Sequence, residues 1–219
     1  MKRTEWNSLS HDAKVEFVEK KSVFIAQAGP VRGSEEASEF LSRVKAEYPD
    51  AGHHVYAWRA GENALLQKYS DDGEPSGTAG LPVLDALRKN DIDDAIIVVT
   101  RYFGGTLLGK GGLVRSYGRS ALLALKEAVP VLYCICEVYN IMLSYTYLDK
   151  LLFSLERAGY LLESQEFGMD PVLRVGCRLG EGKTLCDFCT DLTSGQAIVE
   201  YIGKKTIQKE RLGELRFES

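Results

Sequence analysis

The sequence predicts a two-domain protein of the α+β class. After Pro130, strand-like and helix-like segments follow one another in the order βαββαβ, which is the order of a ferredoxin-like domain. Before Pro130, strands and helices surround residues 95–101, a nearly unbroken run of β-branched residues typical of a strand covered on both faces. A chain of 219 residues is long enough for two domains, and we expect them at residues 1–130 and 131–219.

The N-terminal region opens with a polar lead, followed by a strand pattern and then a helix pattern. Residues 13–28 alternate apolar and polar side chains and stop at Gly-Pro, which predicts one or two strands. A helix is expected next, because Ser34 can cap its first turn and Pro49 ends it. Phe40 and Val44 would then lie on one face of that helix.

The rest of the N-terminal region supplies three strands and two helices. Residues 53–60 and 64–70 flank a short polar connection, which favours an antiparallel strand pair. Turn-forming residues then lead into a short helix at 81–89. The strand at 95–101 is followed by a glycine-rich stretch and by leucines with helical spacing at 111–128.

The C-terminal region contains the βαββαβ series. Its expected elements are a strand at 136–144, a helix at 148–158, strands at 160–167 and 172–179, a helix at 183–193 and a strand at 197–202. The second helix contains Cys186 and Cys189 as a C-x-x-C. No second ligand pair of zinc spacing follows, so we favour an apolar helix face over a metal or redox site.

Composition restricts the class of function. With 45% hydrophobic and 26% charged residues, the chain has the profile of a folded soluble protein, and no apolar run is long enough to span a bilayer. The first residues lack a signal-peptide pattern, so we expect a cytoplasmic location and no membrane partner. The net charge of −4 argues against coating nucleic acid through global positive charge. We therefore expect no DNA specificity, and any phosphate affinity must be local.

The glycine-rich stretch, T-R-Y-F-G-G-T-L-L-G-K-G-G-L-V-R-S-Y-G-R-S at residues 100–120, carries only cationic charges. It contains G-x-x-x-x-G-K between a strand and a helix, which is the spacing of a phosphate-binding P-loop. A nucleotide-hydrolysing P-loop carries Ser or Thr after the lysine to hold magnesium, and this chain has Gly111 there. Glycines leave their backbone amides accessible, and such amides flanked by cations would still recognise phosphate or carboxylate groups. The candidate binding residues are Arg101, Gly104, Gly105, Lys110, Gly111, Gly112, Arg115 and Arg119.

An acidic motif, S-D-D-G-E-P-S-G-T-A-G, places the carboxylates of Asp71, Asp72 and Glu74 close together in the sequence. They could cap the helix that follows, accept hydrogen bonds from Arg101 or Arg115, belong to a partner site, or bind a hard metal. We favour capping and ion pairing, through which the motif would shape the glycine-rich loop, and we assign no metal site. The residues of this motif are Asp71, Asp72, Glu74, Ser76 and Thr78.

Two further groups are secondary candidates. His54 follows His53 in an expected strand, and neighbouring strand residues point to opposite faces, so at most one of the two can join a given site. A possible RNA-binding patch comprises Lys204, Lys205, Lys209 and Arg211. Interspersed glutamates make an ordinary solvated tail the favoured interpretation of that patch. No serine or cysteine lies beside a plausible base in a recognisable nucleophile motif, so no catalytic residue is assigned.

Two long motifs, Y-S-D-D-G-E-P-S-G-T-A-G-x-P-V-L-D-A-L and I-V-V-T-R-Y-F-G-G-T-x-L-G-x-G-G-L-V-R-x-Y, together resemble the signature of the IMPACT/YigZ family. Residues 19–26, E-K-K-S-V-F-I-A, and 51–59, A-G-H-H-V-Y-A-W-R, add to the resemblance. It covers residues 13–130 closely, and the two-domain length is similar to the bacterial YigZ branch.

This resemblance implies the fold of each domain. The N-terminal domain would be a ribosomal-protein-domain-2-like α/β sandwich, shared with a small-subunit ribosomal protein, domain IV of elongation factor G and the GHMP kinases. The C-terminal domain would resemble domain V of elongation factor G, which agrees with the βαββαβ order. The resemblance also implies translation control, since eukaryotic relatives bind the activator of a stress-responsive initiation-factor kinase. That partner is absent from bacteria.

Two hypotheses of function follow. The first is a non-enzymatic, translation-associated regulatory protein that binds RNA, the ribosome or a ribosome-associated protein through the cationic glycine-rich loop, without a cofactor. The second is an enzyme of the hydrolase or phosphotransfer type. It would act on a small phosphorylated or peptide substrate, with a divalent metal at the acidic motif. We favour the first, because the sequence assembles no nucleophile or metal constellation.

Overall fold

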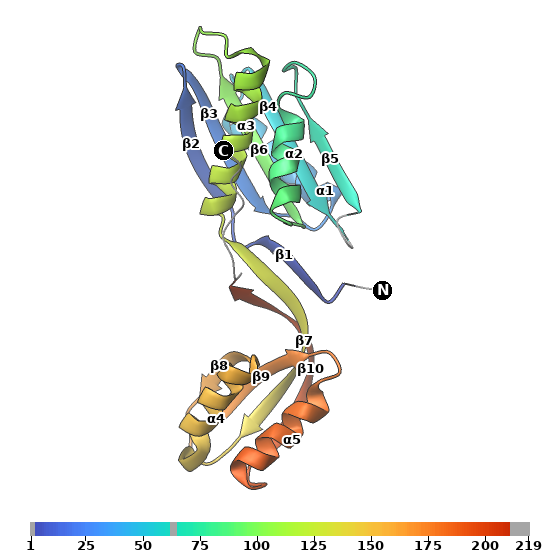
Figure 1. Ribbon diagram of the computed structural model, residues 1–219, viewed down its shortest axis with the longest axis vertical. Helices are drawn as coiled ribbons and strands as arrows, with labels where there is room; N and C mark the ends of the chain where they lie inside the picture. The colour runs from blue at the N-terminus through green and yellow to red at the C-terminus, as the bar shows by residue number, and fades with distance from the viewer. Residues whose placement is uncertain (1–2, 62–64, 211–219) are drawn as a thin grey trace. The chain divides into compact units, whose positions relative to one another are not determined.

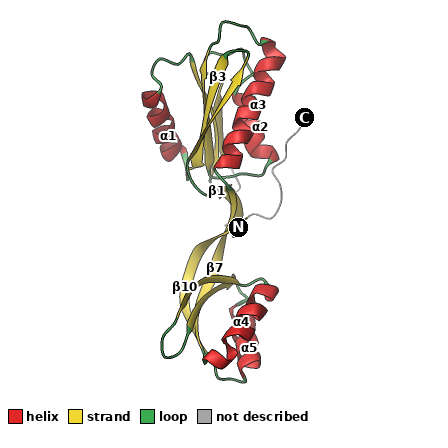
Figure 2. Cartoon of the chain, turned by 90° about the vertical axis from the view of Figure 1, so that its left-hand side faces the viewer, coloured by secondary structure: helices red, strands yellow, loops and turns green. Residues whose placement is uncertain are grey.

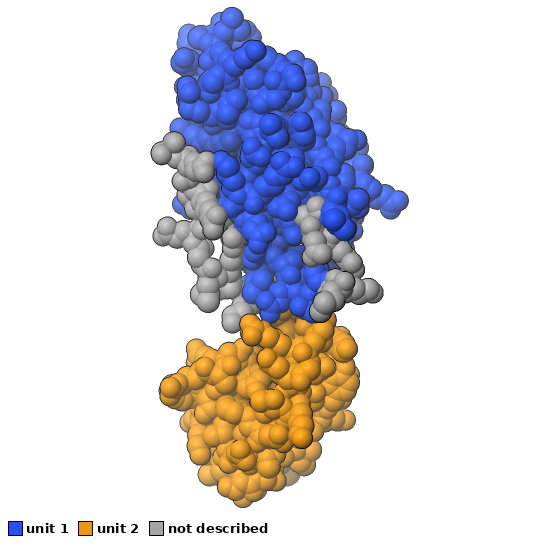
Figure 3. Space-filling model, turned by 45° about the vertical axis from the view of Figure 1, so that its right-hand side comes forward, with its two compact units in different colours: residues 1–132, 210–219 blue, residues 133–209 orange. Residues whose placement is uncertain are grey.

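The computed structural model describes residues 3–61 and 65–210. These residues form five helices and two five-stranded sheets, which confirms the α+β class (Figure 1). They separate into two compact units: residues 3–132 with Glu210 form unit 1, and Tyr133–Lys209 form unit 2 (Figure 3). Within the described ranges, none of the helices has the length and apolarity needed to cross a membrane.

An antiparallel sheet forms the centre of unit 1. Its strands are β2 (Ala13–Glu19), β3 (Ser22–Pro30), β4 (His53–Ala60), β5 (Leu66–Ser70) and β6 (Ala95–Tyr102). Their order is β2-β3-β6-β4-β5, and every neighbouring pair is antiparallel. Helix α1 (Ser34–Glu47) covers one face, while α2 (Gly80–Lys89) and α3 (Gly109–Glu127) cover the other (Figure 2).

Strand β6 occupies the middle of this sheet and is buried on both faces. Ile97 and Val99 belong to the core beneath α2 and α3, whereas Ile96 and Val98 belong to the core beneath α1. All four are 0% exposed, and burying such a side chain contributes about 1.5–3 kcal/mol. The continuous β-branched run therefore predicted this strand correctly, because a strand between two helical layers needs apolar residues on both sides.

Strand β1 (Glu5–Leu9) was not expected, because its sequence, E-W-N-S-L, lies in the polar lead. Leu9 is fully buried, and the Ser8 hydroxyl donates a hydrogen bond to the carbonyl of Asp94 at 2.9 Å. The strand pairs with β7 (Pro130–Met142). Long-range pairing, and not local periodicity, thus makes this segment a strand.

The turn between β2 and β3 carries two lysines in an unusual backbone conformation. Lys20 has φ 46° and Lys21 has φ 68°, the left-handed region that two-residue hairpin turns normally fill with Asn-Gly. The turn is held from outside by Gly104, where an added Cβ would overlap the backbone of Lys21 and Ser22. Strain retained at two lysines suggests that their side chains have a role beyond closing the hairpin.

Unit 2 shows the βαββαβ order that the sequence predicts. After β7 come α4 (Tyr145–Ala158), β8 (Leu161–Glu166), β9 (Val172–Arg178), α5 (Gly182–Thr193) and β10 (Ile198–Glu210). Strand β7 pairs with β9 and β10, and β9 pairs with β8. Helices α4 and α5 lie on the same face of these strands (Figure 2). The last strand runs well beyond the end at residue 202 that its apolar residues suggested.

The C-x-x-C of α5 is part of this core. Cys189 is fully buried with Leu185 in the cluster beneath the helix, while Cys186 is half-buried. Burial raises the pKa of the Cys189 thiol to about 12, so this thiol is protonated at neutral pH. An apolar helix face explains the motif without metal or redox chemistry.

We expect Lys20→Asn combined with Lys21→Gly to raise the free energy of unfolding by about 1–2 kcal/mol, because both residues tolerate positive φ better than lysine does. Urea denaturation checks this. The matched control, Lys20→Gln with Lys21→Gln, removes the same charges but keeps the strain, and should leave stability unchanged. Equal stability of the Asn-Gly variant and the parent would show that the turn is unstrained.

Candidate functional site

The first carboxylate of the acidic motif, Asp71, caps helix α2. Its Oδ1 accepts hydrogen bonds from the backbone amides of Ala79 at 3.0 Å and Gly80 at 2.8 Å, and its Oδ2 accepts one from Gly77 at 2.9 Å. These amides are at or just before the start of the helix and would otherwise lack partners. Capping was one of the roles predicted for this motif, and Asp71 performs it from nine residues before the helix starts.

Asp72 connects the acidic loop to strand β4. Its Oδ2 accepts a hydrogen bond of 2.6 Å from the backbone amide of His54, and its carbonyl lies 2.8 Å from Nδ1 of His53. The His54 ring turns the other way and lies 3.0 Å from the Tyr48 carbonyl, where it is buried. Of the two imidazole rings, only that of His53 approaches the acidic motif, whereas the ring of His54 is buried beside the Tyr48 carbonyl.

Glu74 is buried at the centre of a polar network. Its Oε1 accepts hydrogen bonds from Arg101 Nη1 at 2.6 Å and from the Tyr117 hydroxyl at 2.7 Å. The Arg101 guanidinium also donates to Ser22 Oγ at 3.2 Å and lies over the Phe24 ring. Arg101 is 5% exposed. The prediction that Arg101 contributes to an exposed cationic face is therefore wrong, since its charge is matched by an internal carboxylate.

Tyr117 ties helix α3 into this network. Burial, followed by the negative charge of Glu74, raises the pKa of Tyr117 above its ordinary value. The hydroxyl is therefore a permanent donor to Glu74, and the ring packs edge-on against Phe24 at 5.3 Å. The network joins the acidic loop, strand β6 and α3.

The remaining residues of the acidic motif shape its turn. The Thr78 hydroxyl donates to the Pro75 carbonyl at 2.6 Å and is buried, whereas Ser76 is exposed. Across the described ranges, no group of three or more His, Cys, Asp or Glu side chains is arranged to hold a metal ion. The three carboxylates instead accept bonds from protein donors in three separate places.

The glycines before α3 and in its first turn have different roles. Gly104 is required by close backbone packing against the Lys20–Lys21 turn, and its amide donates to Ser22 Oγ at 3.2 Å. Gly105 and Gly109 have φ 82° and 69°, a conformation that L side chains rarely adopt. Gly111 and Gly112 lie in the first turn of α3, which contains no acidic residue and no side-chain cap.

Three predicted cations are exposed on this side of unit 1: Lys110, Arg115 and Arg119. Within the described part of the chain, none of the three forms an ion pair or side-chain hydrogen bond. The Arg119 guanidinium stacks on the Phe17 ring at 4.4 Å from its centroid, which holds the charge in place without neutralising it. The cationic surface is thus made by α3 and excludes Arg101.

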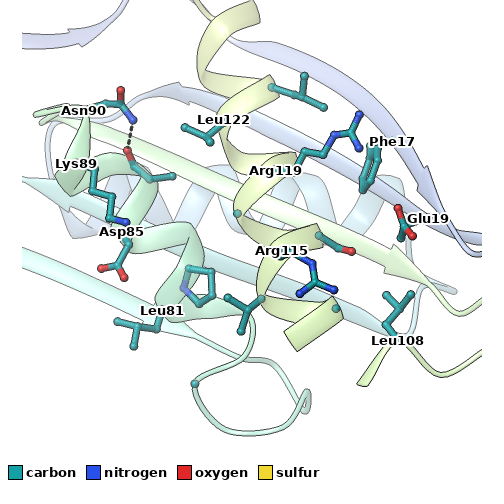
Figure 4. Close-up of a pocket in the computed structure, with 18 of the residues that line it drawn as sticks. Phe17, Glu19, Leu81, Asp85, Lys89, Asn90, Leu108, Arg115, Arg119 and Leu122 are labelled. Atoms are coloured by element: carbon teal, nitrogen blue, oxygen red, sulfur yellow. Dashed lines mark hydrogen bonds between the residues drawn. The ribbon is translucent and has the colours of Figure 1, made fainter. Parts of the chain in front are cut away.

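Arg115 and Arg119, but not Lys110, line a groove of about 790 Å³ on the surface of unit 1. Figure 4 shows Arg119 beside Phe17, with Arg115 one turn earlier on α3. Strand β2, the turn after it, α2 and α3 all contribute to its lining, which also contains Lys20. The aliphatic lining residues are Leu81, Pro82, Ala86, Leu108, Val114, Leu122 and Leu123.

Sequence reasoning missed Lys20, Phe17 and the apolar residues of this groove. The adjacent Lys20 and Lys21 between two strand patterns were the available signal, because a two-residue turn places both beside whatever packs on the hairpin. The aliphatic residues carried no such signal, since a leucine at helical spacing is expected in the core.

One further glycine lies in the groove. Gly118 is in the middle of α3, and a Cβ added there would meet no atom of the described residues within 4 Å, apart from the backbone of the helix itself. Glycine inside a helix costs about 0.5–1 kcal/mol relative to alanine. Among the residues that the structure describes, no contact requires the small residue at this position.

The secondary lysines belong to unit 2. Lys204 and Lys205 are exposed on β10, and Lys205 forms an ion pair with Glu163. The side chain of Lys209 and all of Arg211 fall outside the described part of the chain. The RNA-binding patch that the sequence suggested there stays a prediction. One of its cations, Lys205, is already paired within the chain.

Comparison with known proteins places this chain in a family. Residues 20–125 match the Impact N-terminal domain. The chain is 36% identical to "IMPACT family member YvyE" of Bacillus subtilis, over 84% of this chain and 85% of that protein. It is 46% identical to "IMPACT family member YigZ" of Escherichia coli, over 49% of this chain and 54% of that protein. A solved structure titled "Crystal structure of an hypothetical protein" is 31% identical, with a TM-score of 0.59 over 91% of this chain and 98% of that one.

We expect Glu74→Gln to lower the free energy of unfolding by about 3 kcal/mol, because it leaves the Arg101 charge buried without a counter-charge. Urea denaturation measures the change. The control Glu16→Gln removes an exposed glutamate on β2 and should change stability by less than about 0.5 kcal/mol. A Glu74→Gln variant as stable as the control would mean that the pair contributes nothing to the fold.

We expect Gly118→Ala to raise the free energy of unfolding by about 0.5–1 kcal/mol, since it improves helix propensity and meets no neighbouring atom. Thermal and urea unfolding of the two proteins provide the comparison. A loss of stability would indicate that the position is constrained within the chain.

Proposed function

Because the chain belongs to the IMPACT family, we propose that it is a cytoplasmic, translation-associated regulatory protein. It binds RNA, the ribosome or a ribosome-associated protein through the first turn and exposed face of α3. We further propose that residues 1–130 form an IMPACT-type domain related to domain IV of elongation factor G. Residues 131–219 would then form a domain related to its domain V. Relatives named "Protein IMPACT" in Oryctolagus cuniculus and Danio rerio match 45% and 42% of this chain, which supports a role common to the family.

The observation that carries the proposal is the unpaired charge on α3. The whole chain has a net charge of −4, yet Lys110, Arg115 and Arg119 are exposed and lack acidic partners among the described residues. Clustered cations without internal partners attract anionic surfaces such as RNA and the ribosome. Binding of this kind weakens as the salt concentration rises. The glycine-rich first turn adds uncapped backbone amides of the same polarity.

In this proposal the acidic motif and Arg101 hold the surface and do not contact the partner. Glu74 and Tyr117 fix α3 against β6, and Asp71 fixes α2 beside it. The metal-dependent enzyme hypothesis gains no support, because each of the three carboxylates already accepts bonds from donors within the chain. Gly111 also stands where a hydrolysing P-loop needs a hydroxyl.

We expect Arg115→Glu with Arg119→Glu to reduce co-sedimentation with purified bacterial ribosomes by about tenfold or more at 50 mM salt, because the reversed charges repel phosphate. The parent should also lose binding steeply as salt rises from about 50 to 200 mM.

The matched control for this experiment is Lys126→Glu with Lys150→Glu, which reverses two exposed lysines, one late in α3 and one in unit 2. It gives the same net charge and should bind within about twofold of the parent. Equal loss in both variants would attribute binding to overall charge, and no loss in either would remove α3 as the binding surface.

A further inference from the structure

The groove beside Arg115 and Arg119 has the composition of a protein-binding site. Its aliphatic side chains come from α2, α3 and the loop before α3. Val114, which lines the groove, is 40% exposed. Apolar surface left open in this way is characteristic of a site covered by a partner.

The groove is less suited to single-stranded RNA. Such sites stack bases on open aromatic rings. Among the described residues, Phe17 is the one aromatic residue that lines the groove, and the Arg119 guanidinium lies over its ring at 4.4 Å from the centroid. The lining therefore offers aliphatic contact and charge, without a free stacking platform.

The positive charge of the groove lining favours an acidic binding partner. Among the described residues, the lining contains four cations, Lys20, Lys89, Arg115 and Arg119, against two acids, Glu19 and Asp85, which gives a formal charge of 4 − 2 = +2. Asp85 is within 3.6 Å of Arg88, which offsets part of its charge. Among the described residues, Lys20, Arg115 and Arg119 lack ion-pair partners. The strained turn that presents Lys20 adds a second reason to give that lysine an external role.

The spacing of Arg115 and Arg119 along α3 favours a helical binding partner. Arg115 and Arg119 are one helical turn apart on the same face, a separation of about 6 Å, which matches carboxylates four residues apart on a second helix. Gly118 lies beside them with open space above its Cα. A helix without a side chain at that point lets another backbone approach closely.

We propose that this groove binds an acidic amphipathic helix from a partner protein. The helix lays leucine-type side chains against the aliphatic lining, close to Gly118, and directs Asp or Glu side chains four residues apart to Arg115 and Arg119. This inference rests on the proposed function, and it assigns the contact at the groove to protein instead of nucleic acid.

The experiment uses the full 219-residue chain and a phage-displayed library of random 16-residue peptides as the probe. Selection against the parent, with removal of phage that bind the Arg115→Glu/Arg119→Glu variant, should enrich peptides with apolar residues at helical spacing and acids at i, i+4. Enriched peptides are then synthesised with a fluorescent label and titrated by anisotropy.

We expect each of two changes to weaken the binding of these peptides, with a Kd about tenfold higher. The changes are Arg115→Glu/Arg119→Glu and Gly118→Leu, which fills the point of close approach. Circular dichroism and thermal unfolding check that Gly118→Leu is folded, and the arginine variant tests the same groove without altering the helix interior. The Lys126→Glu/Lys150→Glu control should bind as the parent does.

Three results would overturn the inference: no enrichment, enrichment of basic peptides, or peptide binding unchanged by Gly118→Leu in a folded protein. Binding of a labelled deca-uridine that requires Arg115 and Arg119, without peptide enrichment, would assign the surface to RNA. If ribosome co-sedimentation still depended on the two arginines in that case, the proposed function would stand and only the protein-helix inference would fail.

Discussion

The buried bond between Glu74 and Arg101 organises unit 1. An arginine with 5% exposure in a sheet is costly unless a carboxylate meets it, and Glu74 does so at 2.6 Å. The Tyr117 hydroxyl shares the same carboxylate oxygen and brings α3 to the network. Through these contacts one carboxylate fixes the acidic loop, the central strand and the helix that carries the exposed cations. Removal of one partner would leave the other charge buried, so the elements depend on one another.

This arrangement separates two kinds of cation within one glycine-rich stretch. Arg101 is the second-last residue of β6, and its charge is paired with Glu74 inside the fold. Lys110, nine residues later, Arg115 and Arg119 are exposed to solvent. Gly104 lies between Arg101 and the exposed cations in the sequence, and its backbone packs directly on the Lys20–Lys21 turn. The turn and α3 thereby contribute to the same groove positive charges that have no ion-pair partner among the described residues. A rigid buried network thus supports a surface of exposed cations.

Much of the fold could be predicted from the sequence, because local periodicity and burial agree in most elements. The β-branched run of β6 and the apolar spacing of α3 are examples. Strand β1 could not be predicted, since its pairing partner is more than 100 residues away in the sequence. The burial of Arg101 could not be predicted either, because the sequence does not show whether an arginine near the end of a strand points into the core or into solvent. Capping by Asp71 followed from residue type, whereas the groove required the packing of α2, β2 and α3 to be known.

The separate cores of the two units have a spectroscopic consequence. Both tryptophans of the chain, Trp6 and Trp58, lie in unit 1, and unit 2 contains none. Tryptophan emission therefore reports on unit 1 alone, while far-ultraviolet circular dichroism reports on the helices of both. Superimposable unfolding curves from the two signals would indicate one cooperative molecule, and displaced curves would give each unit its own melting transition.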